Sequence, residues 1–353
     1  MSERARRREL ARADKVIPGV WRLRLPLPWP GVPHGNAYAV AAGAGVVLLD
    51  TGMFQPGSLG QLELALGQAG LRLEHVRLLV CTHAHADHYG MAKPIMDASG
   101  CELWMHPNDE HMRRNVEDPD AQQERRLEVA LQSGVPIESV ERAREARKGG
   151  GSGVAELVEP DRHLRPGLEV DTDLGRWQVY ETPGHAPSHV VLHQPDRKLM
   201  VSGDHILGRI SLFYDDGWTP DPAGEFLTSL DTVEPLPTDL ILAGHGKPVR
   251  DLRGLVAGNR AAVHARMGRV RDALSELDQP TPFDIVPKLM QTENLNPMLV
   301  SWGLSEALAY LRHLELTEVA EKVAGSDPER WRLTGGGSPA RQAARLGSRA
   351  SRP

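Results

Sequence analysis

Four potential metal ligands, His83, His85, Asp87 and His88, lie within six residues of one another. The preceding segment, residues 76–81, is apolar and has the length of a buried strand. A strand that ends here places the four side chains on a loop at the edge of a sheet, where a rigid backbone aims them at one point. Three imidazoles and a carboxylate are costly to bury without partners. The segment therefore predicts a metal site rather than a solvated polar loop.

Three further ligand candidates follow glycines at the ends of short apolar runs: His185, Asp204 and His245. A glycine lets the backbone turn tightly at such a position. Each of the three alone would be an ordinary turn residue. With the first segment they make five imidazoles and two carboxylates, too many for one tetrahedral ion and suited to two ions that share a ligand.

The predicted site divides these ligands between two divalent ions. One ion is assigned His83, His85 and His185; the other Asp87, His88 and His245; Asp204 bridges them. Imidazoles favour Zn²⁺, and Fe and Mn also suit such a site. A bridging hydroxide would be the nucleophile, since water bound in such sites ionises near neutral pH. Asp87 is also the predicted catalytic residue, because its free oxygen can handle the proton.

Composition narrows the class of protein and its compartment. The chain has 353 residues, a formal net charge of −6 and two cysteines, Cys81 and Cys101. This charge gives no case for attraction to nucleic acid or membranes, and no apolar run approaches the roughly 18 residues of a membrane span. Two cysteines make no disulfide framework and suit a reducing compartment, so we expect a cytoplasmic protein.

The order of predicted elements favours an α/β fold. Two strand-rich halves, each with flanking helices, predict a four-layer αββα sandwich over residues 16–250. Residues 1–15 are expected to form a flexible arm, and 26–35 a proline-rich loop. Residues 107–148 have a helical period that predicts two or three helices, and the glycine-rich residues 148–153 predict a flexible loop.

The C-terminal part has a different pattern. Residues 251–334 predict three helices and a short hairpin, a small winged-helix-like helical domain, and we call this range the C-terminal module. It is expected to pack on the catalytic domain as part of the substrate wall or of a homodimer contact. Residues 335–353 predict a disordered tail.

The ordered motifs resemble those of the metallo-β-lactamase superfamily: His-x-His-x-Asp-His at 83–88, then Pro-Gly-His, Gly-Asp and Gly-His. Asp50, in Asp50-Thr51-Gly52, matches that family's first motif, and the resemblance implies that it supports the site without binding metal. The C-terminal module resembles the appended domain of hydrolases of the β-lactamase-like-protein-2 type.

Departures from the family pattern narrow the range of possible substrates. Asp204 argues against antibiotic hydrolysis, because true β-lactamases lack an aspartate ligand there. The large inserted domain of RNA-processing relatives is absent, and so is the basic substrate motif of glyoxalase II. Four residues are predicted to line the substrate cleft: His34, His205, Arg209 and Tyr214.

A small-molecule thioester or ester, such as an acyl-CoA, is the predicted substrate. A lactonase is an alternative, because it uses the same attack on an acyl carbon. A single-stranded RNA endonuclease is another, but residues 255–334 hold nine Lys and Arg against eleven Asp and Glu, so they form no basic patch. A winged-helix regulator with a metal-sensing domain is the non-enzymatic alternative.

Overall fold

A computed structural model describes residues 10–29, 31–147 and 151–335. Its first sheet has seven strands in the order of the chain, antiparallel from the first to the fourth and parallel from there on. The strands are β1 (Arg12–Ile17), β2 (Val20–Trp29), β3 (Val32–Ala42), β4 (Gly45–Leu49), β5 (Val76–Val80), β6 (Glu102–Met105) and β7 (Arg162–His163).

The second sheet has five strands in the order β12-β11-β10-β9-β8. Only the β11–β12 pair within it is parallel. Its strands are β8 (Glu169–Thr172), β9 (Gly175–Glu181), β10 (Val190–Gln194), β11 (Leu199–Gly203) and β12 (Leu240–Ala243).

The alternation of side chains along each strand explains the layers. Val47 and Leu49 of β4 join Leu242 of β12 in the core between the sheets, whereas Val46 and Leu48 face the opposite core. Because successive side chains point to opposite faces, strands that are apolar throughout must be covered on both sides.

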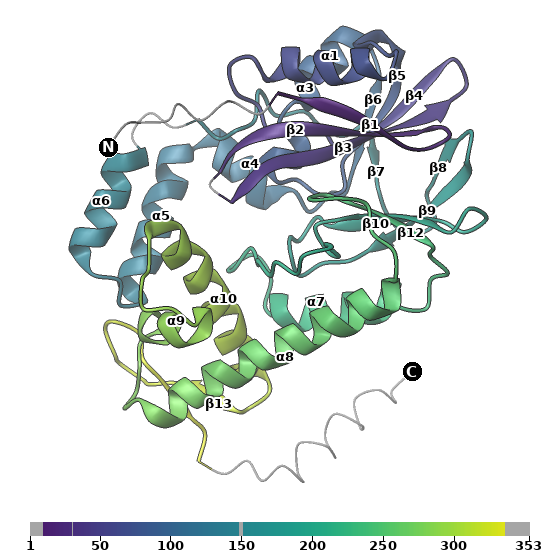
Figure 1. Cartoon of the computed structure of the whole chain (residues 1–353). Helices are drawn as coiled ribbons and strands as arrows, with labels where there is room; N and C mark the ends of the chain where they lie inside the picture. Colours follow the sequence, from purple (N-terminus) through teal and green to yellow (C-terminus); the bar gives the residue numbers. More distant parts are fainter. Residues whose placement is uncertain (1–9, 30, 148–150, 336–353) are drawn as a thin grey trace, which may run out of the picture.

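Helices cover the two outer faces (Figure 1). On the first sheet lie α1 (Ser58–Gln68) and α3 (Ala92–Ser99). On the second lie α7 (Pro222–Val233) and α8 (Leu252–Glu276). The predicted four-layer αββα sandwich is confirmed.

The helical stretch that follows β6 forms α4 (Glu110–Glu117), α5 (Pro119–Gln132) and α6 (Ile137–Arg147). Leu127 of α5 and Val140 of α6 share a small apolar cluster with Leu304 and Leu308. The inserted helices therefore pack against the C-terminal helices, from which they are far apart in sequence, as Figure 1 also shows for α5 and α10.

The C-terminal module contains the predicted elements: α8, α9 (Pro282–Met290), α10 (Pro297–Leu316) and a hairpin of β13 (Ala320–Lys322) and β14 (Trp331–Leu333). One apolar core runs from Met200 and Ile241 of the second sheet through Val256 to Tyr310 and Trp331. The module is thus packed on the sandwich through a continuous core. Of the helices in the described residues, none is long and apolar enough to cross a membrane.

Two predictions near the N-terminus were wrong. The flexible arm was predicted to reach residue 15, but β1 begins at Arg12 and pairs with β2, where Asp14 lies 2.6 Å from Arg22. The charged sequence of β1 does not predict a strand, because this strand is stabilised by its pairing with β2. The proline-rich loop is instead a long hairpin of β2 and β3, and its prolines fall near a break in strand register between Pro26 and Trp29.

Residues 1–9, 148–150 and 336–353 lie outside the described part of the chain. The predictions of a flexible N-terminal arm, of a flexible glycine-rich loop and of a disordered tail concern these residues, wholly or in part.

From a buried histidine in β10, His193, we expect the stability of the fold to fall in acid independently of the candidate metal ligands. His193 donates from Nε2 to the Pro237 carbonyl at 2.9 Å, and its Nδ1 has no hydrogen-bond partner in the described residues. Burial lowers the pKa of His193, although the Pro237 carbonyl works in the opposite direction. As the pH falls below the usual histidine pKa of about 6.5, the unfolded chain takes up this proton first, so stability falls.

We therefore expect His193→Gln to lose less stability than the wild type on acidification from about pH 7.5 to pH 5.5. Glutamine keeps a donor for the carbonyl and does not titrate. The same change at the exposed His163 is the control. Urea unfolding of the metal-free proteins at several pH values measures the free energy of unfolding. An equal change of this free energy with pH in the wild type and in His193→Gln would contradict the prediction.

Candidate metal centre

The seven predicted ligands lie where strands of both sheets end. The first four follow β5, and α2 (Ala86–Tyr89) begins among them. His185, Asp204 and His245 follow β9, β11 and β12. The sandwich thus brings four loops to one edge, which is the arrangement that the positions of the ligands after strands predicted.

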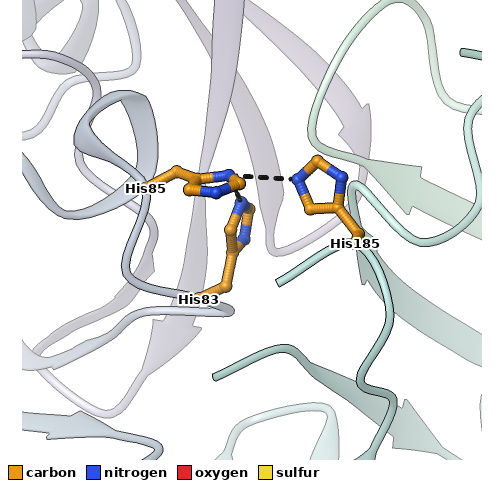
Figure 2. A group of neighbouring side chains, drawn as sticks. All are labelled: His83, His85 and His185. Carbon is orange, nitrogen blue, oxygen red and sulfur yellow. Dashed lines mark hydrogen bonds between the residues drawn. The ribbon is translucent and has the colours of Figure 1, made fainter. Parts of the chain in front are cut away.

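Three imidazoles converge in a first group (Figure 2). His85 Nδ1 lies 3.0 Å from His83 Nε2 and 3.1 Å from His185 Nε2. His83 and His185 therefore direct their Nε2 atoms, and His85 directs its Nδ1 atom, toward one point. These nitrogens lie close enough to hold one ion.

Hydrogen bonds on the far side of each ring assign the tautomers. His185 Nδ1 donates to the Phe213 carbonyl at 3.1 Å, which leaves the lone pair on Nε2. Thr82 Oγ1 donates to Asp50 and so accepts from His83 Nδ1 at 3.0 Å, which leaves the lone pair of His83 on Nε2 as well. Neutral imidazoles with these lone pairs are the form that binds metal.

A second group contains Asp87, His88 and His245. Asp87 Oδ2 lies 3.2 Å from His245 Nε2 and 3.4 Å from His88 Nε2. The other ring nitrogens are again fixed, since His88 Nδ1 donates to Asp50 and His245 Nδ1 to the His34 carbonyl. Two Nε2 atoms and a carboxylate therefore face one another.

Asp204 lies between the two groups. Its oxygens are 3.2 Å from His245 Nε2, 3.5 Å from His88 Nε2 and 3.8 Å from His185 Nε2. His88 Nε2 and Asp204 Oδ1 are buried and have no hydrogen-bond partner in the described residues. Buried polar atoms of this kind are costly unless something binds them. Nitrogen and carboxylate donors that face inward without partners fit a pair of divalent cations.

Asp50 supports this arrangement from behind the ligands. Its carboxylate accepts from the Thr82 backbone N–H at 2.7 Å, from the Thr82 hydroxyl at 3.0 Å and from His88 Nδ1 at 2.9 Å. Its backbone is left-handed, with φ of 62°. Asp50 thus orients His88 and, through Thr82, His83, without facing the centre itself.

The pKa values divide the five imidazoles: burial favours the neutral form of His83 and His185, whereas nearby carboxylates outweigh burial and raise the pKa values of His85, His88 and His245. Burial lowers the pKa of His83 well below its usual range and, helped by His85, lowers the pKa of His185 to about 4. Burial opposes the ionised form of Asp204, but His245 and His88 lower its pKa further than burial raises it. Burial also opposes the charged form of His245, yet Asp204 and Asp87 raise its pKa to about 10. The carboxylates therefore attract a cation strongly.

The predicted substrate residues occupy different places. His205 is buried against Phe226, with ring centroids 4.8 Å apart, and Tyr214 is fully buried between Phe226 and Tyr310. Both belong to the core beneath the second sheet, so the prediction that they line a cleft was wrong. His34 is half-buried, and its backbone carbonyl accepts a hydrogen bond from His245 Nδ1. Arg209 is exposed.

Three residues around the centre were missed. Asp215 Oδ2 lies 2.7 Å from His85 Nε2 and 2.9 Å from His111 Nδ1. His189 Nδ1 lies 2.8 Å from the Thr182 hydroxyl, and its Nε2 accepts from the Asp204 backbone N–H at 3.1 Å. A second histidine four residues after His185 was a usable signal. The helical sequence around His111 contained none.

Two glycines allow the ligand loops to approach closely. Gly203 has φ of +47°, and a Cβ atom there would lie 2.6 Å from His189 Nε2. A Cβ atom at Gly244 would lie 2.2 Å from Asp204 Oδ1 and 2.8 Å from His88 Cε1. The glycines that precede two ligands in the sequence are thus required by packing at the centre itself.

A four-layer αββα sandwich with histidines and aspartates at one edge defines a class of metal-dependent hydrolases. The family model described as Metallo-beta-lactamase superfamily matches residues 30–245. The chain therefore belongs to the metallo-beta-lactamase superfamily, as the order of its motifs indicated.

Curated relatives and solved structures extend the similarity beyond the matched range. The chain is 25% identical over 303 residues to the probable metallo-hydrolase YqjP of Bacillus subtilis, covering 84% of this chain and 92% of that protein. It is 25% identical over 276 residues to a beta-lactamase-like protein 2 homolog of Caenorhabditis elegans, covering 77% of this chain and 76% of that protein. It is 24% identical over 180 residues to the hydroxyacylglutathione hydrolase GloC of Haemophilus influenzae, covering 49% and 69%.

Among solved structures, a beta-lactamase domain protein from Burkholderia ambifaria superposes with a TM-score of 0.79 at 27% identity, covering 91% of this chain and 94% of that one. A metallo-beta-lactamase family protein from Thermus thermophilus gives 0.76 at 26% identity, covering 91% and 100%. Coverage of this extent includes helices beyond residue 245, so the C-terminal module is shared by these structures at least in part.

Gly244→Ala is expected to weaken metal binding by steric displacement of Asp204 and His88. We expect at least a roughly tenfold loss of affinity, the lower end of what altered ligand support costs. Gly246→Ala is the control, because it has φ of +77° but no atom within 4 Å of the added Cβ. Its left-handed backbone should cost about 1–2 kcal/mol of stability and leave the metal in place. Metal content after dialysis distinguishes the two variants, and equal retention would contradict the steric argument.

Proposed function

We propose that this metal-dependent hydrolase uses two divalent ions, most simply Zn²⁺, to cleave a small acyl thioester or ester such as an acyl-CoA. The observation that carries the proposal is the convergence of five imidazoles and two carboxylates into two groups joined by Asp204. Similarity to GloC supports a thioester, because its name describes hydrolysis of a hydroxyacylglutathione.

In this proposal the two groups hold one ion each. His83, His85 and His185 would hold the first, and Asp87, His88 and His245 the second, with Asp204 shared. The donor set also suits Fe or Mn. When bound, such ions acidify water at the site and polarise the substrate carbonyl.

In this proposal, Asp87 orients the attacking water, and neighbouring groups hold the imidazoles in the tautomers that bind metal. Burial raises the pKa of Asp87, but His88 and His245 outweigh this effect and keep its carboxylate ionised. An ionised Asp87 can accept a hydrogen bond from the attacking water and orient it toward the acyl carbon. Asp50 and the Phe213 carbonyl hold His88 and His185 in the tautomers that leave Nε2 free.

Packing of the C-terminal module favours a small substrate over RNA. The module joins the sandwich through a continuous core and contacts α5 and α6 through a second cluster. Residues 255–334 hold nine Lys and Arg against eleven Asp and Glu. Binding along an RNA backbone neutralises many phosphates and needs an excess of positive charge, so we assign the module to the substrate wall and not to RNA binding. Cys81 and Cys101 are buried and unpaired, which supports a reducing compartment such as the cytoplasm.

The proposal is tested with metal-free protein reloaded with Zn²⁺, Mn²⁺ or Fe²⁺ and given acyl-CoA thioesters, simple esters, homoserine lactones and RNA oligonucleotides. We expect metal-dependent hydrolysis of at least one thioester or ester. Turnover confined to lactones would assign a lactonase, and salt-sensitive cleavage of RNA an endonuclease. Either result, or no turnover across the panel, would refute the thioester assignment.

Asp87→Asn is expected to reduce kcat/KM by at least about 100-fold, because it removes both a ligand charge and the acceptor for the water proton. Asp97→Asn is the matched control, since Asp97 is an exposed carboxylate on α3 that pairs only with Lys93 among the ion pairs of the described residues. Initial rates on the best substrate, with metal content measured in parallel, test the prediction. An active Asp87→Asn enzyme with two ions bound would exclude Asp87 from the chemistry.

A further inference from the structure

The segment Phe213, Tyr214, Asp215 contacts two of the proposed ligands of the first ion. Asp215 Oδ2 lies 2.7 Å from His85 Nε2, and the Phe213 carbonyl accepts from His185 Nδ1 at 3.1 Å. The Asp215 backbone N–H also donates to the His185 carbonyl at 3.2 Å. One short segment between β11 and α7 thus sets the orientation of two imidazoles at once.

Asp215 is itself held by a chain of hydrogen bonds whose donors and acceptors balance. Its Oδ2 accepts from His85 Nε2–H and from His111 Nδ1–H, the latter at 2.9 Å. His111 Nε2 then accepts from the Ser188 hydroxyl at 3.0 Å, and Ser188 Oγ accepts from the Ala84 backbone N–H at 2.9 Å. The chain returns to the residue between His83 and His85. It leaves His85 with its lone pair on Nδ1.

Helix α10 anchors the same segment from the other side. The Ser305 hydroxyl donates to the Tyr214 carbonyl. The Tyr214 and Tyr310 rings lie 5.6 Å apart at 79°, and their hydroxyls are 3.4 Å apart. Tyr310 also donates to the buried Glu306, which forms an ion pair with the partly buried Arg266 of α8. The anchor therefore reaches from the C-terminal module to the segment beside the ligands.

We infer that Asp215 is a positioning residue for His85 and that helix α10 holds it in place, so the C-terminal module takes part in building the first metal site. The inference rests on the proposed role of His85 and His185 as ligands. Asp215 accepts the Nε2–H of His85, which directs Nδ1 to the ion and makes it more basic. This is the way carboxylates support metal-bound histidines in general.

The experiment measures metal binding, with no substrate present. Zn²⁺ affinities and stoichiometry of the wild type, Asp215→Ala and Asp215→Asn are obtained by competition with a chelator, and Co²⁺ absorption spectra report the ligand geometry. We expect Asp215→Ala to weaken one of the two binding steps about 10- to 100-fold and to change the Co²⁺ spectrum. Asp215→Asn keeps an acceptor for His85, so it should recover part of the affinity. Asp216→Asn is the control, since Asp216 is the neighbouring carboxylate, whereas the ion pairs of this segment with His85 and His111 involve Asp215.

Wild-type affinity and spectrum in Asp215→Ala would overturn the inference. So would three ions in the wild type and two in Asp215→Ala, because His85, His111 and Asp215 would then form a separate metal site. Thermal unfolding of each metal-free variant separates loss of fold from loss of metal. A wild type that binds two ions yet hydrolyses nothing in the panel would refute the proposed substrate class and leave this inference standing.

The role of α10 is tested by Ser305→Ala, with the exposed Ser301→Ala on the same helix as the control. Loss of one hydrogen bond to the Tyr214 carbonyl should weaken the same binding step roughly two- to tenfold. The Co²⁺ spectrum should shift in the direction seen for Asp215→Ala. A lower melting temperature with unchanged metal affinity would show that Ser305 only stabilises the fold and would refute the anchoring role.

Discussion

The centre depends on hydrogen bonds that hold one nitrogen of each of five imidazoles, three of them buried and two partly buried. An imidazole has two nitrogens, and a fixed acceptor for the N–H of one directs the lone pair of the other. Here the acceptors come from separate parts of the chain. They are the Thr82 hydroxyl, the Asp50 and Asp215 carboxylates, and the Phe213 and His34 carbonyls. Without them the rings would be free to choose tautomers that oppose metal binding.

The sandwich makes such an arrangement rigid. Strands that are buried on both faces move little, and their ends supply the loops on which the ligands lie. Alternate residues of β4 and β12 face different cores, so each strand is held from two sides. Close contact at Gly244 and Gly203 then sets the separation between neighbouring loops. The candidate ligands are thus positioned by packing over the whole sandwich rather than by the loops alone.

Helices outside the sandwich complete the surroundings of the centre. His111 of α4 reaches Asp215, and Ser305 of α10 reaches the carbonyl of Tyr214. The same packing explains why Tyr214 and His205 do not face a substrate. Both side chains fill the core that joins the second sheet to α7 and the C-terminal helices. A polar residue beside a ligand in the sequence points to the opposite side of the strand end as readily as toward the site.

The sequence by itself determined the layered fold, the order of elements in the C-terminal module and the candidate ligands that the structure brings together, because His and Asp motifs and apolar periodicity are local patterns. It did not reveal β1, whose charged residues need β2 as a partner, or the long β2–β3 hairpin across its prolines. Only the tertiary structure decided which residues support the ligands. His111 and Asp215 are 104 positions apart, and no local pattern relates two side chains that meet only when α4 and the segment after β11 fold against the same loop.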